Sequence, residues 1–229
     1  IQLFGRQTQG TIPDAGVSVR GSAAEFDVPG WLALAGKAED GAGLQNLDLL
    51  IENFRLAGGE FGAVRLQRVP VSGSMTIRAI GQNLDGSLTL PDDAKAPVLA
   101  RFATVHAGLP AKKAAPATGD TPIDPGDPAG LPPIDLRVDD LRIGKLALGR
   151  VELSTAPMAG GMAINRLSSQ SPLLTVNASG AWLGTAAQSA TSLKAQLASP
   201  DLGRLLDSAG FVDVFERGKG DFRLTGTWP

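Results

Sequence analysis

The chain has 229 residues, of which 43% are hydrophobic and 19% charged, a composition typical of folded globular proteins and not of disordered tails. The formal net charge is −2 and no basic block stands out, which argues against a nucleic-acid-binding surface. Cysteine is absent, so disulfides, iron–sulfur clusters and thiolate zinc sites are excluded.

Alternation of apolar and polar residues predicts β-strands along most of the chain, beginning with Val17 and Val19. The 29 glycines and 16 prolines favour many turns between these strands. Two segments have a helical pattern instead. Residues 27–34 read as a short amphipathic helix with Pro29 in its first turn. Residues 201–210 read as another, with Asp201 as its N-cap and Gly210 at its end.

A proline-rich segment divides the chain at residues 110–133, which hold seven of the sixteen prolines and almost no large apolar residue. Proline lacks a backbone donor and restricts its neighbours, so this segment is predicted to be an extended linker or loop. The predicted organisation is therefore an N-terminal segment, 1–109, and a C-terminal segment, 134–229, which includes the short helix near 201–210.

The two segments contain an internal repeat. Residues 47–79 align without a gap to residues 134–166, at an offset of 87. The strand alternation slips in phase at the same place in both copies, after Ile51 in the first and after Val138 in the second. A shared slip indicates a β-bulge. Repetition over such a distance is typical of stacked supersecondary units, and the predicted architecture is a long, mostly antiparallel meander with one apolar face.

Residues that could do acid–base or nucleophilic chemistry are scarce. His106 is the only histidine, tyrosine is absent, and neither a second histidine nor a cysteine could complete a metal shell with His106. An isolated histidine at the surface or at a strand end is the expected environment. Asp139 and Asp140 fall at the predicted bulge, where a solvated bend accounts for them better than a cation site. The sequence therefore predicts no enzymatic activity, no metal and no cofactor.

Both ends of the sequence resemble cuts in a longer protein. The chain begins at Ile1, without a methionine or a leader, and ends directly after an alternating run. No stretch approaches the roughly 18–20 apolar residues that a membrane-spanning helix needs. We expect the chain to be a piece of a larger polypeptide.

Several runs resemble the C-terminal region of the YhdP family, which belongs to the AsmA-like group and is more distantly related to TamB. These runs are LPPIDLRVDDLRIGKLALGRVELSTAP (131–157), ASGAWLG (178–184), SATSLKAQLASPDLGRLLDSAGF (189–211), GDFRLTGTWP (220–229) and EFDVPGWLALA (25–35). The resemblance covers essentially the whole chain. It consists of apolar spacing with Gly, Asp and Trp, and contains no catalytic signature.

The resemblance implies a protein of Gram-negative bacteria that is anchored in the inner membrane and crosses the periplasm. In this family the β-sheet curls lengthwise into an apolar groove, and the proteins are implicated in moving phospholipid to the outer membrane. Phospholipid and, through other parts of the chain, the two membranes are then the expected partners. Aliphatic side chains suit such a conduit, because burying acyl chains yields about 0.8 kcal/mol per methylene without directional contacts.

Alternating apolar positions are the candidates for the groove lining. They are Leu47, Leu49, Ile51, Ile134, Leu136, Val138, Leu174, Val176, Leu193, Leu197, Phe222 and Leu224. The same alternation would form the dry interior of a closed β-sandwich, and from the pattern alone that alternative is favoured. The resemblance to the YhdP family reverses this preference in favour of an open groove. Two functions stay open, a lipid conduit and a β-rich scaffold or interaction module in envelope assembly that carries no lipid.

Overall fold

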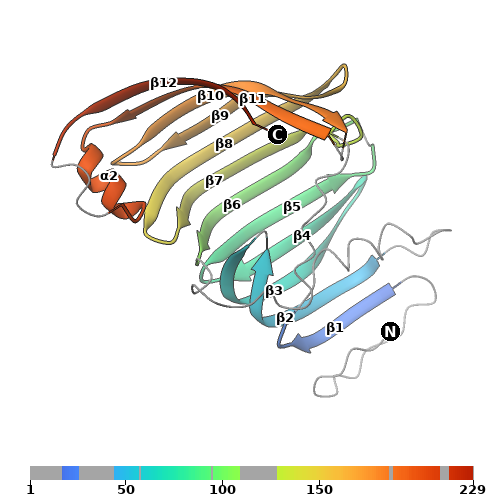
Figure 1. The fold of residues 1–229 in the computed structure, drawn as a ribbon. Coiled ribbons are helices and arrows are strands. Elements are labelled where there is room, and N and C mark those ends of the chain that lie inside the picture. The colour runs from blue at the N-terminus through green and yellow to red at the C-terminus, as the bar shows by residue number, and fades with distance from the viewer. Residues whose placement is uncertain are drawn as a thin grey trace.

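The computed structural model describes residues 17–25, 44–56, 58–93, 95–108, 128–185, 188–211 and 217–228. They form one twelve-stranded sheet that curves along its length without closing into a barrel (Figure 1). This confirms the predicted fold class, a mainly β protein built on a long curled sheet. The elements are β1 (Val17–Ala23), β2 (Leu44–Leu56), β3 (Gly59–Val71), β4 (Ser74–Gly81), β5 (Leu84–Pro91), β6 (Val98–Ala107), β7 (Ile134–Ile143), β8 (Leu146–Met158), β9 (Gly161–Gln170), β10 (Thr175–Thr185), β11 (Gln188–Ser199), α2 (Leu202–Ser208) and β12 (Gly220–Trp228).

The strands follow one another across the sheet in chain order. Nine of the eleven neighbouring pairs are antiparallel, as predicted. The pairs β1–β2 and β6–β7 are parallel, which corrects the expectation of an unbroken antiparallel meander. Alternation did not reveal this, because it reports the two faces of a strand and not the strand's direction.

A parallel pair needs a connection that carries the chain back along the sheet. The two connections, 24–43 and 108–133, contain two of the segments that depart from the strand pattern in the sequence, the predicted helix at 27–34 and the proline-rich segment at 110–133. The helix predicted at 27–34 lies outside the described residues, as do residues 109–127 of the proline-rich segment. Residues 128–133 of that segment are described by the structure, and Pro128 and Pro133 are buried.

The two repeat copies have the same pairing register in their first strand pair, β2–β3 and β7–β8, whereas β8–β9 has a shift between Ser154 and Thr155 that β3–β4 lacks. Strands β2, β3 and β4 correspond to β7, β8 and β9, and the register shifts at matching places. The corresponding pairs are Ile51–Val64 with Val138–Val151, and Phe54–Gly62 with Leu141–Gly149. The predicted bulge is therefore confirmed in both copies.

Glycine faces each bulge for a steric reason. Gly62 and Gly149 have φ angles of 70° and 68°, a conformation that L side chains rarely adopt. A Cβ atom on Gly149 would also collide with the backbone carbonyl oxygen of Gln170 on β9. The bulge thus depends on a residue without a side chain at these positions.

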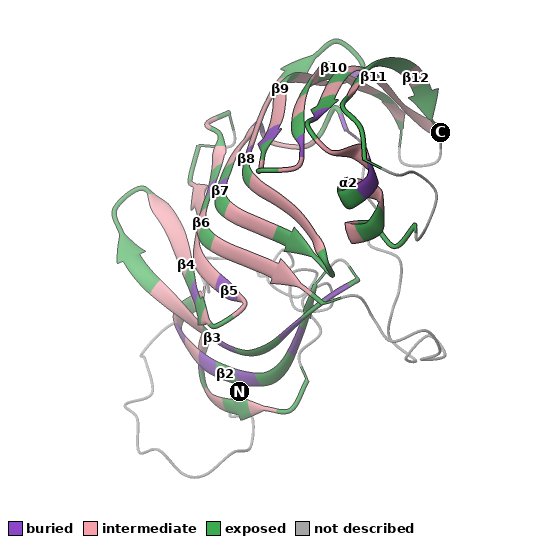
Figure 2. Cartoon of the chain, turned by 90° about the vertical axis from the view of Figure 1, so that its left-hand side faces the viewer, coloured by how far each residue is buried: buried purple, intermediate pink, exposed green. Residues whose placement is uncertain are grey.

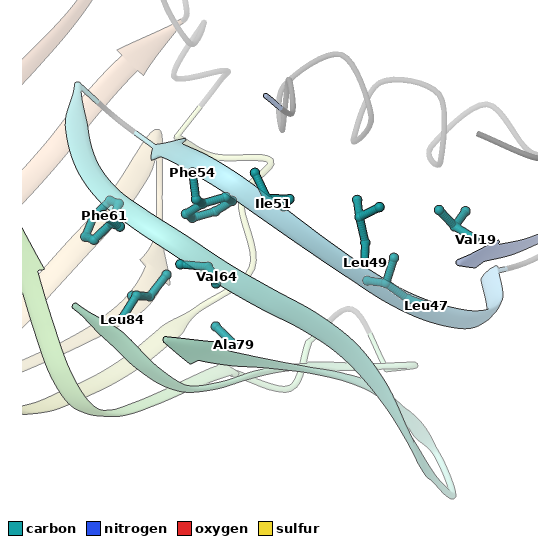
Figure 3. Packing of buried hydrophobic residues seen from close by; sticks show 9 residues of the cluster. All are labelled: Val19, Leu47, Leu49, Ile51, Phe54, Phe61, Val64, Ala79 and Leu84. Atoms are coloured by element: carbon teal, nitrogen blue, oxygen red, sulfur yellow. The ribbon is translucent and has the colours of Figure 1, made fainter. Parts of the chain in front are cut away.

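The most tightly packed part of the sheet is its N-terminal end, where β1 to β5 surround a hydrophobic cluster (Figure 3). The cluster consists of Val19, Leu47, Leu49, Ile51, Phe54, Phe61, Val64, Ala79 and Leu84. The curl closes locally beside it. The backbone N–H of Glu60 donates to Gly108 at 3.0 Å, and that of Gly108 donates to Glu60 at 2.8 Å, so the start of β3 meets the end of β6.

The helix predicted near 201–210 is present as α2. The Asp201 side chain accepts a hydrogen bond from the backbone N–H of Arg204 at 3.1 Å, which is the predicted N-cap. Although α2 follows β11, it contacts β8, three strands away in the sheet. The curl of the sheet brings the helix into this position (Figure 1).

Candidate functional site

Residues that pair across neighbouring strands lie on the same face of a sheet, so the pairing register traces each face from end to end. One line of paired residues crosses all twelve strands and is almost entirely apolar. This central row consists of Gly21, Leu49, Leu66, Ala79, Gly86, Phe102, Val138, Val151, Ser169, Val176, Leu197 and Phe222. The apolar face is therefore continuous from β1 to β12.

A second row lies two residues farther along each strand, on the same face. It runs from β3 to β12 through Arg68, Ile77, Leu88, Ala100, Leu136, Leu153, Leu167, Ala178, Ala195 and Leu224. Nine of its ten members are apolar, and Arg68 is the exception. Together the central row and the second row give the face a wide aliphatic surface.

The opposite face carries a polar row between the two apolar ones. It is formed by Arg20, Asp48, Gln67, Arg78, Ser87, Arg101, Arg137, Glu152, Ser168, Asn177, Gln196 and Arg223. Along these rows the sheet has one apolar and one polar side, although Leu50 and Ile80, which pair with Arg65 beside the polar row, are exposed apolar residues.

The structure places the predicted lining residues on the apolar face. Leu49, Val138, Val176, Leu197 and Phe222 belong to the central row, and Leu136 and Leu224 to the second row. The others pair on the same face or lie two residues from a row member: Leu47, Ile51, Ile134, Leu174 and Leu193. Contact of these residues with lipid stays a prediction.

Sequence reasoning did not name the residues that β3, β4, β5, β8 and β9 contribute to this face. Leu66, Ile77, Leu88, Leu153 and Leu167 stand in the two rows between the predicted positions. Leu88 belongs to an alternating run that is visible in the sequence, and the repeat relates Leu66 to Leu153. These two signals could have found part of the missing set.

The two ends of the sheet differ in burial, with buried residues on β2 and none among the described residues of β12 (Figure 2). Leu49 and Ile51 are 0% exposed and belong to the packed cluster, and Val138 is 3% exposed. At the other end, Phe222 is 42% and Leu224 is 53% exposed. The face is thus filled by its own side chains near β2 and lies open near β12.

On the polar face, charged side chains neutralise one another. The Arg65 guanidinium makes two contacts with the Asp48 carboxylate, at 2.6 and 2.7 Å. This hydrogen bonding from Arg65 holds the pKa of Asp48 below its usual value, against the opposing effect of burial. Such exposed pairs keep the face hydrated and contribute little to the free energy of folding.

His106 lies near the end of β6, as expected, but it is not isolated. Its Nε2 atom is 2.8 Å from Oδ2 of Asp140, which also receives Arg142 at 3.0 Å. Burial raises the pKa of Asp140, but the hydrogen bonds from His106 and Arg142 outweigh it, so the pKa lies below its usual value. Among the described residues, no three His, Asp or Glu side chains gather as a metal site would require.

A sequence model of the YhdP family, described as YhdP protein, matches residues 3–229. The chain belongs to the YhdP family. As a member of that family it is an AsmA-like envelope protein. Searches of curated proteins and of solved structures found no match to it.

In this YhdP-family chain, the described helix is too short and too polar to cross a bilayer. The part of the chain that the structure describes instead offers one extended feature, the apolar face. Its chemistry is apolar throughout the central row, apart from Ser169, with two phenylalanines and two glycines among the aliphatic residues. Such a surface can hold hydrocarbon.

Proposed function

We propose that this chain is a segment of a periplasm-spanning protein whose apolar face shields phospholipid acyl chains during transport between the inner and outer membranes. The observation that carries the proposal is the central row, because an apolar path that crosses every strand is what a sliding acyl chain needs. Membership of the YhdP family supports it. Tethering to the inner membrane would come from parts of the protein outside this sequence.

Aliphatic contacts fit transport better than an ordered binding pocket would. Each buried methylene contributes about 0.8 kcal/mol, and neighbouring positions along the path are nearly equivalent in free energy. A chain can then advance by small steps without a deep minimum. Row residues on β12, such as Phe222 and Leu224, expose apolar surface to solvent, and a lipid would cover that surface.

We infer that the segment has no catalytic role. The one histidine is engaged with Asp140, and both lie away from the apolar rows, beside Arg142. The remaining ion pairs also join exposed or half-buried groups, for example Arg65 with Asp48. None of these groups is directed at a substrate site on the aliphatic surface.

The second candidate is a scaffold in envelope assembly that carries no lipid. The packed cluster favours it, because Leu49, Ile51 and Val64 are fully buried by neighbouring side chains. If the whole face were filled in this way, it would be an ordinary core. The open end of the face near β12 favours the conduit.

Photo-cross-linking from single positions tests the conduit against the scaffold. A photoreactive residue at Val176 or Leu136 would lie on the apolar face, and matched controls at Thr175 and Arg137 would lie on the polar face. In cells producing the full-length protein, we expect phospholipid adducts at the first two positions only. Equal labelling of both faces, or labelling of neither, would favour the scaffold.

A further inference from the structure

Arg68 is the one charged residue in the two apolar rows. On β3 it pairs with Ile77 of β4, and the row continues through Leu88 and Ala100. Arg65, on the same strand, pairs with Leu50 and lies on the polar face. A cation at position 68 therefore interrupts an aliphatic surface.

The guanidinium of Arg68 is only partly satisfied. Its Nη1 atom donates to the backbone carbonyl of Gln45 at 2.7 Å. Its Nε atom is shielded from solvent and has no hydrogen-bond partner among the residues that the structure describes. Within the described residues Arg68 makes no ion pair, whereas Arg65 holds the Asp48 carboxylate with two nitrogens.

A shielded N–H without an acceptor is costly, and an anion held beside the guanidinium would lower that cost. An anion suits this position because Arg68 is charged and makes no ion pair among the described residues, and it must tolerate aliphatic surroundings, since the neighbours of Arg68 along the row are Ile77 and Leu88. A planar guanidinium fork matches the oxygen atoms of a phosphate group. Phosphate attached to hydrocarbon meets both conditions.

We propose that Arg68 binds the phosphate group of a glycerophospholipid whose acyl chains lie on the adjoining apolar rows. This inference rests on the proposed function and names a contact within it. One arginine adds a single charged contact to an otherwise non-directional surface, so the lipid is oriented at this point and can still leave. Arg68 would thereby set which end of the lipid lies at the β3 edge of the second row.

The test compares two lipids with identical acyl chains, phosphatidylglycerol and the uncharged diacylglycerol. Each is presented in detergent micelles to the purified, delipidated chain, and the retained lipid is quantified by mass spectrometry. We expect about tenfold better retention of phosphatidylglycerol, the effect of one charged hydrogen bond. Arg68→Gln should bring the two lipids to equal retention, and Arg68→Lys should keep part of the difference.

Arg65→Gln is the matched control, because it removes the same group from the opposite face of the same strand. It should leave the preference unchanged, and circular dichroism should show that all variants are folded. Equal retention of both lipids by the unaltered chain would overturn the assignment of Arg68 while leaving the proposed function intact. An equal loss of the preference for phosphatidylglycerol in Arg68→Gln and in Arg65→Gln would have the same consequence. Retention of neither lipid would overturn both.

Inorganic phosphate distinguishes the two sources of this anion. Without acyl chains to bury, a single arginine should give no measurable binding of inorganic phosphate by calorimetry. Tight binding of inorganic phosphate that is lost in Arg68→Gln would assign the residue to the free anion and overturn the lipid assignment.

Discussion

His106 and Asp140 lie 2.8 Å apart and join β6 to β7, the parallel pair at which the second repeat copy begins. The same carboxylate is 3.0 Å from Arg142. Both contacts favour the ionised carboxylate, which explains why the pKa of Asp140 is lowered despite its partial burial.

Asp140→Asn should lower the free energy of unfolding at neutral pH by less than about 1 kcal/mol, because the pair is partly exposed and screened by solvent. A lowered folded-state pKa stabilises the fold above the unfolded pKa, and this contribution disappears as the pH falls through the folded value. Urea unfolding of both proteins should therefore give curves that converge in acid. Asp92→Asn is the control, since the Asp92 side chain makes no ion pair among the described residues. If the difference in free energy of unfolding between Asp140→Asn and the unaltered chain persisted undiminished in acid, the contacts of the ionised Asp140 carboxylate would not be its cause.

Leu49→Ala and Leu224→Ala compare the same substitution at the two ends of the apolar face. Leu49 is 0% exposed, so its truncation should cost about 2–5 kcal/mol of stability through a cavity. Leu224 is 53% exposed, so its truncation should cost less than about 1 kcal/mol. Denaturant titration measures both, and equal costs would show that the face is packed alike at both ends.

Val176→Asp and Thr175→Asp place the same charge on opposite faces of β10. The first should reduce the phospholipid that co-purifies with the protein, because an ionised carboxylate on the apolar path is poorly compatible with hydrocarbon. The second should leave the lipid content unchanged. Lipid extraction followed by mass spectrometry gives the comparison, and an equal loss in both variants would argue against a path on the Val176 face.

Gly149→Ala should destabilise the chain by more than Gly160→Ala. Both glycines have positive φ angles, 68° and 75°, so each substitution strains the backbone by about 1 kcal/mol or more. At Gly149 the new methyl group also meets the Gln170 carbonyl, whereas a Cβ on Gly160 has open space. Thermal unfolding should show the larger shift for Gly149→Ala, and the reverse order would contradict the account of the bulge.

The amino-acid sequence by itself determined the strands, their two faces and the bulge. Alternation depends only on side chains lying on opposite sides of an extended chain, so Leu136 and Val138 could be assigned to one face without coordinates. The phase slip after Ile51 and after Val138 reported the bulges for the same reason. The helix at 202–208 was also predictable, because its cap, Asp201, is local.

Only the tertiary structure decided how the strands are joined and how deeply each is buried. The parallel pairs β1–β2 and β6–β7 depend on where a long connection returns, which local patterns do not encode. Leu49 and Leu224 have similar alternating surroundings in sequence, yet one is fully buried and the other is exposed. That difference arises from the curl of the sheet, which packs β2 against its neighbours and leaves β12 open. Burial depends on surfaces that meet through space, and the alternation of residues along a strand contains no information about them.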